Sequence, residues 1–189
     1  METGEARRAA FIDRDGVINA ELNYVHRIED FHILPGVFDA LAALRDAGYA
    51  IVVVTNQAGI AKGKYTEAQF QRLTSHMLDL FNDRQIQVER VYHCPHHPEG
   101  TVAEYAVDCH CRKPGPGMIE QAVRDLNLRV DRSVLIGDKI SDTDAGRAAG
   151  VATNILVESG HALPADANEH ADHRAKDLHE AVNWFLERQ

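Results

Sequence analysis

Two aspartates near the N-terminus have the spacing of a nucleophile and a general acid. Asp13 and Asp15 follow the apolar run at 9–12, which predicts a short buried strand, and residues two apart in extended chain point to the same side. One carboxylate can attack phosphorus, and the other can protonate the leaving oxygen, with a metal between them. Asp and Gly are also common in turns, so residues 13–17 taken alone leave an ordinary strand-to-loop turn open.

Polar and cationic residues elsewhere could hold a phosphoryl group. Thr55, Asn56 and Gln57 end a predicted strand, and their hydroxyl, amide and backbone N–H groups can bind phosphate oxygens, although a polar loop fits equally well. Arg112 and Lys113 lie just before a predicted helix. A cation at that place can neutralise both a nucleophile and a transferring phosphoryl group, whereas most Arg-Lys pairs are simply solvated.

A further carboxylate follows the predicted strand at 133–137. Asp138 could complete an oxygen-lined Mg²⁺ site with Asp13. Asp142 could support this site from the start of a helix, or serve as an ordinary acidic residue in a first turn. Lys139, next to Asp138, is predicted to bind substrate.

The three cysteines of the chain fall within one short segment with metal-ligand spacing. A C-x-H pair and a C-x-C pair supply three thiolates and an imidazole, a full tetrahedral zinc set. The predicted ligands are Cys94, His96, Cys109 and Cys111, with His97 and His110 as competing imidazoles. Four protein ligands leave no open position, so this Zn²⁺ would be structural and would rigidify the loop at about 94–111, which leads into Arg112 and Lys113. The later histidines, His161, His170, His173 and His179, lack such spacing and are expected at the surface.

The elements that must position these residues alternate along the chain, which predicts an α/β fold with a Rossmann-like parallel sheet and helices on both faces. Predicted strands lie at 9–13, 50–55, 89–93, 133–137 and 153–157, and helices at 36–47, 66–83, 115–126, 141–149 and 176–187. Ligands of such sheets bind at the carboxyl ends of the strands. No insertion is long enough for a cap domain, so we expect residues 1–189 to form a single domain with an open site.

Composition limits the classes of partner. The 189 residues carry a net charge of −9, which argues against nucleic acid as a partner. No apolar run is long enough to span a membrane, and the N-terminus has no signal-peptide hydrophobic segment. The expected location is therefore the cytoplasm.

Four motifs in order resemble those of haloacid-dehalogenase-like phosphatases: residues 11–17, Thr55-Asn56, Lys113, and residues 137–142. The resemblance implies that Asp13 is the nucleophile that forms an aspartyl-phosphate, and that Asp15 is the general acid and base. It implies that Thr55 and Lys113 bind the phosphoryl group, and that Mg²⁺ is held by Asp13, Asp138 and the backbone carbonyl of Asp15.

Within this superfamily, the sequence Cys94-Pro-His-His-Pro98, the C-x-C pair and Arg112-Lys113-Pro114 resemble one group. This group comprises the D-glycero-D-manno-heptose-1,7-bisphosphate 7-phosphatases and the related histidinol-phosphate phosphatases. The resemblance implies a capless, monomeric enzyme that removes the C7 phosphate of a small sugar bisphosphate in the synthesis of heptose precursors for lipopolysaccharide. Arg112 would bind the phosphate that is not cleaved, and Asn56 and Gln57 would contact sugar hydroxyls. Ala58 departs from the group, in which Ser is expected.

Three alternatives remain open at this point. A histidinol-phosphate phosphatase would need a carboxylate for the amine of its substrate, for which Glu29 or Asp30 could serve. An open site also fits a broad small-molecule phosphatase. A phosphate-sensing interaction module without turnover is the non-enzyme alternative, but a pure binder has no need of the second aspartate.

Overall fold

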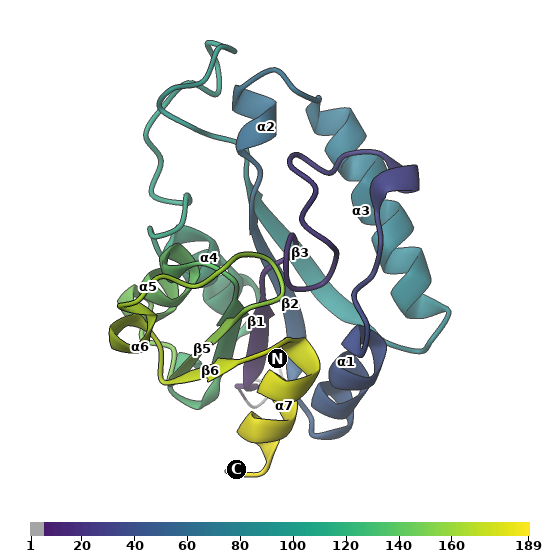
Figure 1. Ribbon diagram of the computed structural model, residues 1–189, viewed down its shortest axis with the longest axis vertical. Coiled ribbons are helices and arrows are strands. Elements are labelled where there is room, and N and C mark those ends of the chain that lie inside the picture. The colour runs from purple at the N-terminus through teal and green to yellow at the C-terminus, as the bar shows by residue number, and fades with distance from the viewer. Residues whose placement is uncertain (1–5) are drawn as a thin grey trace, which may run out of the picture.

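The computed structural model describes residues 6–189, so the first five residues of the N-terminal segment lie outside the described residues. Six parallel strands form one sheet in the order β3-β2-β1-β4-β5-β6 (Figure 1). The strands are β1 (Ala9–Ile12), β2 (Ala50–Asn56), β3 (Val88–Cys94), β4 (Val134–Gly137), β5 (Thr153–Val157) and β6 (His173–Ala175). The chain order reverses between β1 and β4, and ligands of open parallel sheets bind at such a switch point.

Helices connect the strands. They are α1 (Val37–Asp46), α2 (Ala58–Ala61), α3 (Glu67–Asn82), α4 (Gly117–Leu126), α5 (Ile140–Ala148), α6 (Ala167–His170) and α7 (Leu178–Leu186), with short 3₁₀ helices at Ile28–Asp30 and Val130–Arg132. Thr66 and Gln69 form a reciprocal capping box that fixes the start of α3. Gly48 has a φ of +81° just after α1, a left-handed conformation that ends the helix at little cost for glycine.

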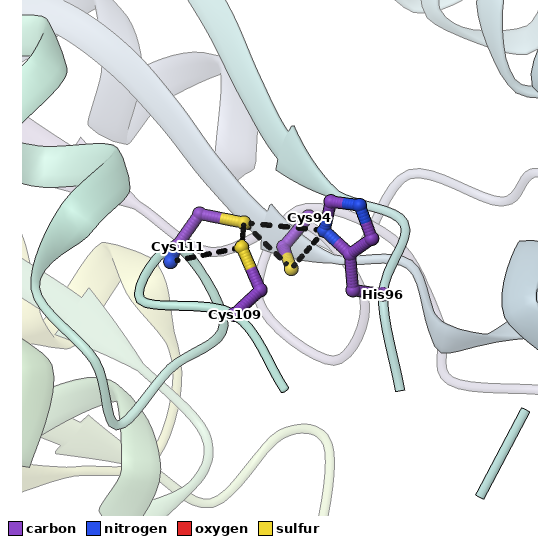
Figure 2. Close-up of side chains that lie close together, drawn as sticks. All are labelled: Cys94, His96, Cys109 and Cys111. Carbon is purple, nitrogen blue, oxygen red and sulfur yellow. Dashed lines mark hydrogen bonds between the residues drawn. The ribbon is translucent and has the colours of Figure 1, made fainter. Parts of the chain in front are cut away.

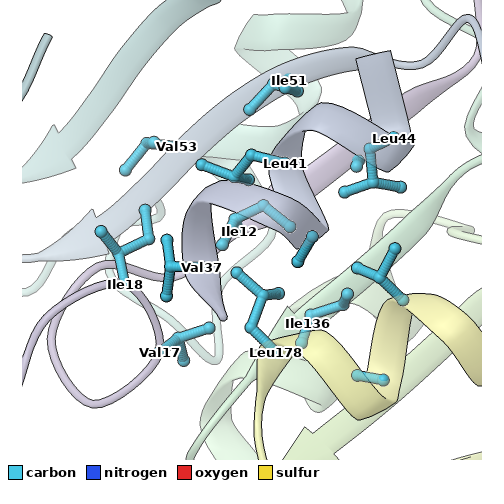
Figure 3. Close-up of a cluster of buried hydrophobic side chains, with 14 of the residues drawn as sticks. Ile12, Val17, Ile18, Val37, Leu41, Leu44, Ile51, Val53, Ile136 and Leu178 are labelled. Carbon is cyan, nitrogen blue, oxygen red and sulfur yellow. The ribbon is translucent and has the colours of Figure 1, made fainter. Parts of the chain in front are cut away.

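The central strands are buried on both faces, as their continuous apolar sequences require. On one face, Ile12, Val53 and Ile136 pack against α1, α3 and α7, and Figure 3 shows them with Leu41 and Leu178 from two of these helices. On the other face, alternate strand residues pack against α4 and α5; they include Phe11, Val52, Val54 and Leu135.

The predicted α/β fold with helices on both faces is confirmed. Every predicted strand and long helix is present, with ends that differ by at most two residues from those expected. The elements that the prediction lacks are short: α2, α6, β6 and the two 3₁₀ helices. Among the described residues, no helix combines the length and the apolar character needed to cross a membrane.

Candidate active site and metal centre

A pocket of about 510 Å³ lies at the carboxyl edge of the sheet. Its lining includes the residues predicted to do chemistry or to bind substrate: Asp13, Asp15, Thr55, Asn56, Gln57, Arg112, Lys113, Lys139 and Asp142. These residues come from segments far apart in the sequence, and the parallel strands bring them to one edge. The structure therefore brings these residues together in one pocket, and the role of each residue stays a prediction.

Lys113 lies between two carboxylates. Its Nζ is 2.8 Å from Oδ1 of Asp13 and 2.7 Å from Oδ1 of Asp142, and all three side chains are nearly inaccessible to solvent. Burial raises the pKa of Asp13 to about 8; Lys113 opposes this rise, while Asp142 and Asp138 add to it. Burial alone lowers the pKa of Lys113, but the two carboxylates raise it overall, so the ammonium stays charged.

Asn56 positions Lys113. The Asn56 amide donates to the backbone carbonyl of Lys113 and accepts from its N–H, both at 3.0 Å, and the Lys113 ammonium also donates to the carbonyl of Val54 at 2.7 Å. Asn56 lines the pocket, but these contacts give its side chain a different task from the predicted contact with sugar hydroxyls. It joins the end of β2 to the loop that carries the lysine.

Asp138 has the environment of a metal ligand. Its buried Oδ1 has no hydrogen-bond partner within the described part of the chain. A buried acceptor without a partner destabilises the folded protein unless a cation binds to it. One carboxylate oxygen each from Asp13, Asp138 and Asp142 lie within 4.8 Å of one another. This donor set fits a hard divalent cation such as Mg²⁺. Burial, and then Asp142, raise the pKa of Asp138 to about 7.

Two glycines make room for Asp138. A Cβ at Gly16 would lie 2.4 Å from its Oδ2, and a Cβ at Gly160 would lie 2.0 Å from the same atom. The loop after β5 is tied to the loop after β1 by a hydrogen bond from the Ser159 hydroxyl to the carbonyl of Gly16, at 2.7 Å. Contact between these loops leaves space only for residues without a side chain.

His161 lies at the surface, as expected, but it also reaches the site. Its side chain is 44% exposed, but its Nδ1 lies 2.6 Å from Oδ2 of Asp138 and it lines the pocket. The loop after β5 carries it there, and no motif spacing marks that loop. His170, His173 and His179 do not line this pocket.

The carboxylate of Asp15 is held by three side chains. Arg14 donates to both of its oxygens, at 2.8 and 2.9 Å from Nη2. Asn19 donates to Oδ1 and Gln57 donates to Oδ2, each at 3.0 Å. Gln57 also donates to the Thr55 hydroxyl at 2.8 Å, and its side chain is buried at the wall of the pocket.

Cys94, His96, Cys109 and Cys111 converge at the end of β3, as Figure 2 shows, with one ligand atom of each within 4.8 Å of the others. A hydrogen bond from Cys111 lowers the pKa of the Cys94 thiol to about 6, towards the thiolate that metals bind. The competing imidazoles lie elsewhere: His110 pairs with Glu120, and His97 accepts from the N–H of Glu99. Three sulfurs and one imidazole nitrogen fit a closed tetrahedral site.

Several side chains in or beside the pocket are not among the predicted site residues. Arg14 lies beside the pocket, on Asp15, and the lining adds Glu21, Asn23, Tyr24, Tyr65, Ser141 and His161. Only Arg14 has a sequence signal, because a charged residue between two aspartates at the end of a buried strand needs an internal partner. Glu29 and Asp30, suggested as partners for an amine, lie in the 3₁₀ helix at Ile28–Asp30 and do not line the pocket.

Comparisons with known proteins agree with this arrangement. A family model described as HAD-hyrolase-like matches residues 110–181. The D-glycero-alpha-D-manno-heptose-1,7-bisphosphate 7-phosphatase of Photorhabdus laumondii is 47% identical over 82% of this chain and 84% of that protein. The D-glycero-beta-D-manno-heptose-1,7-bisphosphate 7-phosphatase of Escherichia coli K12 is 46% identical over 87% of this chain and 86% of that protein.

Solved structures give the same result. The D,D-heptose 1,7-bisphosphate phosphatase from B. bronchiseptica, complexed with magnesium and phosphate, superposes with a TM-score of 0.81 at 27% identity, over 96% of this chain and 99% of that one. A putative HAD-like phosphatase from Mesorhizobium loti has a TM-score of 0.79 at 33% identity, over 95% of this chain and 87% of that one. On the sequence identity and its coverage, the chain belongs to the D-glycero-D-manno-heptose-1,7-bisphosphate 7-phosphatase family of haloacid-dehalogenase-like phosphatases.

Proposed function

We propose that this protein hydrolyses the C7 phosphate of D-glycero-D-manno-heptose 1,7-bisphosphate through an aspartyl-phosphate on Asp13. The observation that carries the proposal is the buried contact of Asp13 with Lys113, beside Asp138 and at the carboxyl edge of the sheet. A nucleophilic carboxylate, a fixed cation and a cation-binding carboxylate are the parts that phosphoryl transfer needs. Relatives that match most of the chain at 46–47% identity bear the name of this activity.

Each side chain has a defined task in this reaction. Asp13 attacks phosphorus, and Asp15 gives a proton to the leaving C7 oxygen and later takes one from the hydrolytic water. Lys113 and Thr55 bind the oxygens of the phosphoryl group, and Asp142 holds Lys113 in place at 2.7 Å. Asp13, Asp138 and the backbone carbonyl of Asp15 would hold Mg²⁺. When bound, this ion would supply positive charge that offsets the buildup of negative charge on the phosphoryl oxygens.

The second phosphate of the substrate needs its own cations. Arg112 and Lys139 both line the pocket, and neither bonds to Asp13. Arg112 donates to the backbone carbonyl of His96 at 3.3 Å, which leaves further N–H groups of its guanidinium for a phosphate. We assign the C1 phosphate to these two residues, with Arg112 as the principal contact.

The cysteine cluster is proposed to bind one structural Zn²⁺. The ligand Cys111 directly precedes Arg112 and Lys113, so a closed metal site fixes the direction in which both cations project. Activity would then depend on zinc through the placement of these side chains and not through chemistry at the metal. We further propose that residues 1–189 act as one domain and as a monomer in the cytoplasm, within the pathway that makes heptose precursors of lipopolysaccharide.

The test is Mg²⁺-dependent phosphate release from the α and β anomers of heptose 1,7-bisphosphate and from histidinol phosphate. The expected result is a large kcat/KM advantage for one heptose anomer, with heptose 1-phosphate as the product by ³¹P NMR. The relatives carry names for both anomers, so the preferred anomer comes from this measurement. Comparable slow turnover of all three substrates would contradict the heptose assignment, and an Asp13→Asn variant serves as the inactive control.

A further inference from the structure

Arg14 is a buried arginine that the assigned chemistry does not use. Arg14 is 1% exposed, and charged side chains are seldom buried without a close partner. The partner is the neighbouring Asp15, whose side chain is 17% exposed. Nη2 of Arg14 lies 2.9 Å from Oδ1 and 2.8 Å from Oδ2, and Nε lies 3.2 Å from Oδ2.

Two amides complete the contacts of Asp15. Asn19 donates to Oδ1 and Gln57 donates to Oδ2, both at 3.0 Å. The Gln57 amide is itself oriented, because its Oε1 accepts from the Tyr65 hydroxyl while its Nε2 donates to Thr55. Both oxygens of Asp15 are therefore fixed in direction, and rotation of the carboxyl group would break several hydrogen bonds at once.

Arg14 is held from its far side as well. Nη2 donates to the carbonyl of Val25 at 2.9 Å, and the guanidinium lies 5.7 Å from the ring centroid of Phe70. The arginine is thus ordered by contacts that do not depend on substrate. A side chain whose place is fixed in advance can orient a neighbouring catalytic group without loss of entropy during the reaction.

We propose that Arg14 is a positioning residue of the phosphatase reaction, which holds the Asp15 carboxyl group where it can protonate the leaving oxygen. This inference rests on the proposed function, because it takes Asp15 to be the general acid. The charges of the pocket support it. Lys113 contacts Asp13 and Asp142, while Arg14 contacts Asp15, so each of the two buried cations serves different carboxylates.

A purely structural role for Arg14 makes a different prediction. By joining Asp15 to Val25, the arginine also ties together two parts of the long segment that follows β1. Its loss would then reduce the amount of active enzyme or disturb the whole pocket, and turnover of every phosphate ester would fall by a similar factor. A positioning role affects only esters whose leaving oxygen needs a proton.

Leaving groups distinguish the two roles. kcat/KM reports the steps up to transfer of the phosphoryl group to Asp13, so it contains the acid step and excludes the later hydrolysis. An alkyl phosphate that the wild type hydrolyses would be compared with p-nitrophenyl phosphate, whose leaving phenolate needs no proton. For Arg14→Met, kcat/KM for the alkyl ester should fall about 100-fold, the scale of general acid catalysis, and that for the aryl ester less than about 10-fold. Arg14→Lys keeps the positive charge but lacks the several N–H donors of the guanidinium. Its kcat/KM for the alkyl ester should lie between those of Arg14→Met and the wild type.

Two controls complete the experiment. In an Asp15→Asn background, Arg14→Met should change kcat/KM for the alkyl ester by less than twofold, because the group through which it acts is gone. Arg8→Met removes a half-buried arginine at the opposite edge of the sheet, where Arg8 contacts Tyr49 and Ala47, and should leave the ratio of the two esters unchanged.

The outcomes separate this inference from the proposed function. Two results would overturn the positioning role. One is an equal fall in kcat/KM for both esters in Arg14→Met. The other is that Arg14→Met lowers kcat/KM for the alkyl ester as much in the Asp15→Asn background as in the wild type. If Arg14→Met does not fold, the same ratio measured for Arg14→Lys decides, because a ratio is independent of the amount of active enzyme. If Asp15→Asn itself leaves the ratio unchanged, the failure lies in the acid role of Asp15 and thus in the proposed mechanism.

Discussion

The ammonium of Lys113 lies 2.8 Å from Oδ1 of Asp13, although 100 positions separate the two residues in the chain. Other parts of the fold place both residues. Asp13 stands at the end of β1, and the loop that carries Lys113 is held against the end of β2 by Asn56. The contact therefore joins the proposed nucleophile to the cation that its reaction needs, and both side chains are nearly inaccessible to solvent.

Replacement of Lys113 by Met should lower kcat by at least about 100-fold, because a buried cation at a developing anionic charge contributes this much or more. Phosphate release under saturating Mg²⁺ measures the effect. Lys64→Met is the matched control: Lys64 is exposed, does not line the active-site pocket and should retain wild-type activity. A Lys113→Met protein with more than a tenth of the wild-type kcat would contradict the role given to this lysine.

The raised pKa values of Asp13 and Asp138, to about 8 and about 7, predict how pH affects the protein without Mg²⁺. An aspartate in the unfolded chain has a pKa near 3.9, so between about pH 4 and pH 8 the folded state binds more protons than the unfolded state. The free energy of unfolding therefore falls as pH rises through this window. Mg²⁺ binds the ionised carboxylates and should offset the loss.

Thermal unfolding at several pH values, with and without Mg²⁺, measures this effect. Asp138→Asn removes one of the two titrating groups and so should show a smaller decrease in Tm with rising pH than the wild type does in Mg²⁺-free buffer. Identical pH dependence in the two proteins would show that burial of Asp138 does not carry the effect.

Much of the site follows from sequence because it lies at strand ends. Asp13, Thr55 and Asp138 each follow an apolar run, and in a parallel sheet such positions meet at one edge. The cluster of three cysteines and one histidine can equally be recognised in the sequence, since Cys and His residues at such short spacing have few other uses. These inferences need only the order of elements and no detailed packing.

Other contacts depend on how loops fold and could not be inferred. His161 reaches Asp138 because the loop after β5 packs on Gly16, at a place where glycines 16 and 160 permit close approach. Likewise, the spacing of Asn56 gives no sign that its amide pairs with the backbone of Lys113. Side-chain direction at the end of a strand is set by tertiary contacts, which spacing alone does not encode.

The close approach around Asp138 gives a prediction with a matched control. Gly16 and Gly150 have nearly the same backbone conformation, with φ of +87° and +82°, so Ala at either position costs roughly 1–2 kcal/mol of left-handed strain. Only at Gly16 would the new Cβ meet Asp138, whereas the nearest atom at Gly150 is 3.8 Å away. Gly16→Ala should raise the Mg²⁺ concentration for half-maximal activity at least about tenfold, because the displaced carboxylate loses its place as a ligand. Gly150→Ala should leave it unchanged, and equal Mg²⁺ requirements in both variants would contradict Asp138 as the metal ligand.

Loss of zinc should lower activity although Asp13 and Asp15 are both still present. Cys109→Ser takes one ligand from the cluster and should lower bound zinc well below one equivalent. It should also lower kcat/KM by about 10-fold or more, the scale on which misplaced catalytic groups reduce rates. His97→Gln is the control, because His97 is not part of the cluster. Metal analysis and kinetics on the same preparations measure both effects, and a zinc-free protein with wild-type kcat/KM would refute the dependence on zinc.

Arg112 should matter only for substrates that carry a second phosphate. It lines the pocket without contacting Asp13, and a charge-assisted hydrogen bond to phosphate contributes about 1.5–3 kcal/mol, which corresponds to roughly 10- to 100-fold in binding. Arg112→Gln should therefore reduce kcat/KM for heptose 1,7-bisphosphate by about this factor, mainly through KM, and change that for heptose 7-phosphate by less than about threefold. If both substrates lose the same factor, Arg112 instead serves the phosphate that is cleaved, or only the backbone of His96, and the C1 phosphate must be bound by Lys139.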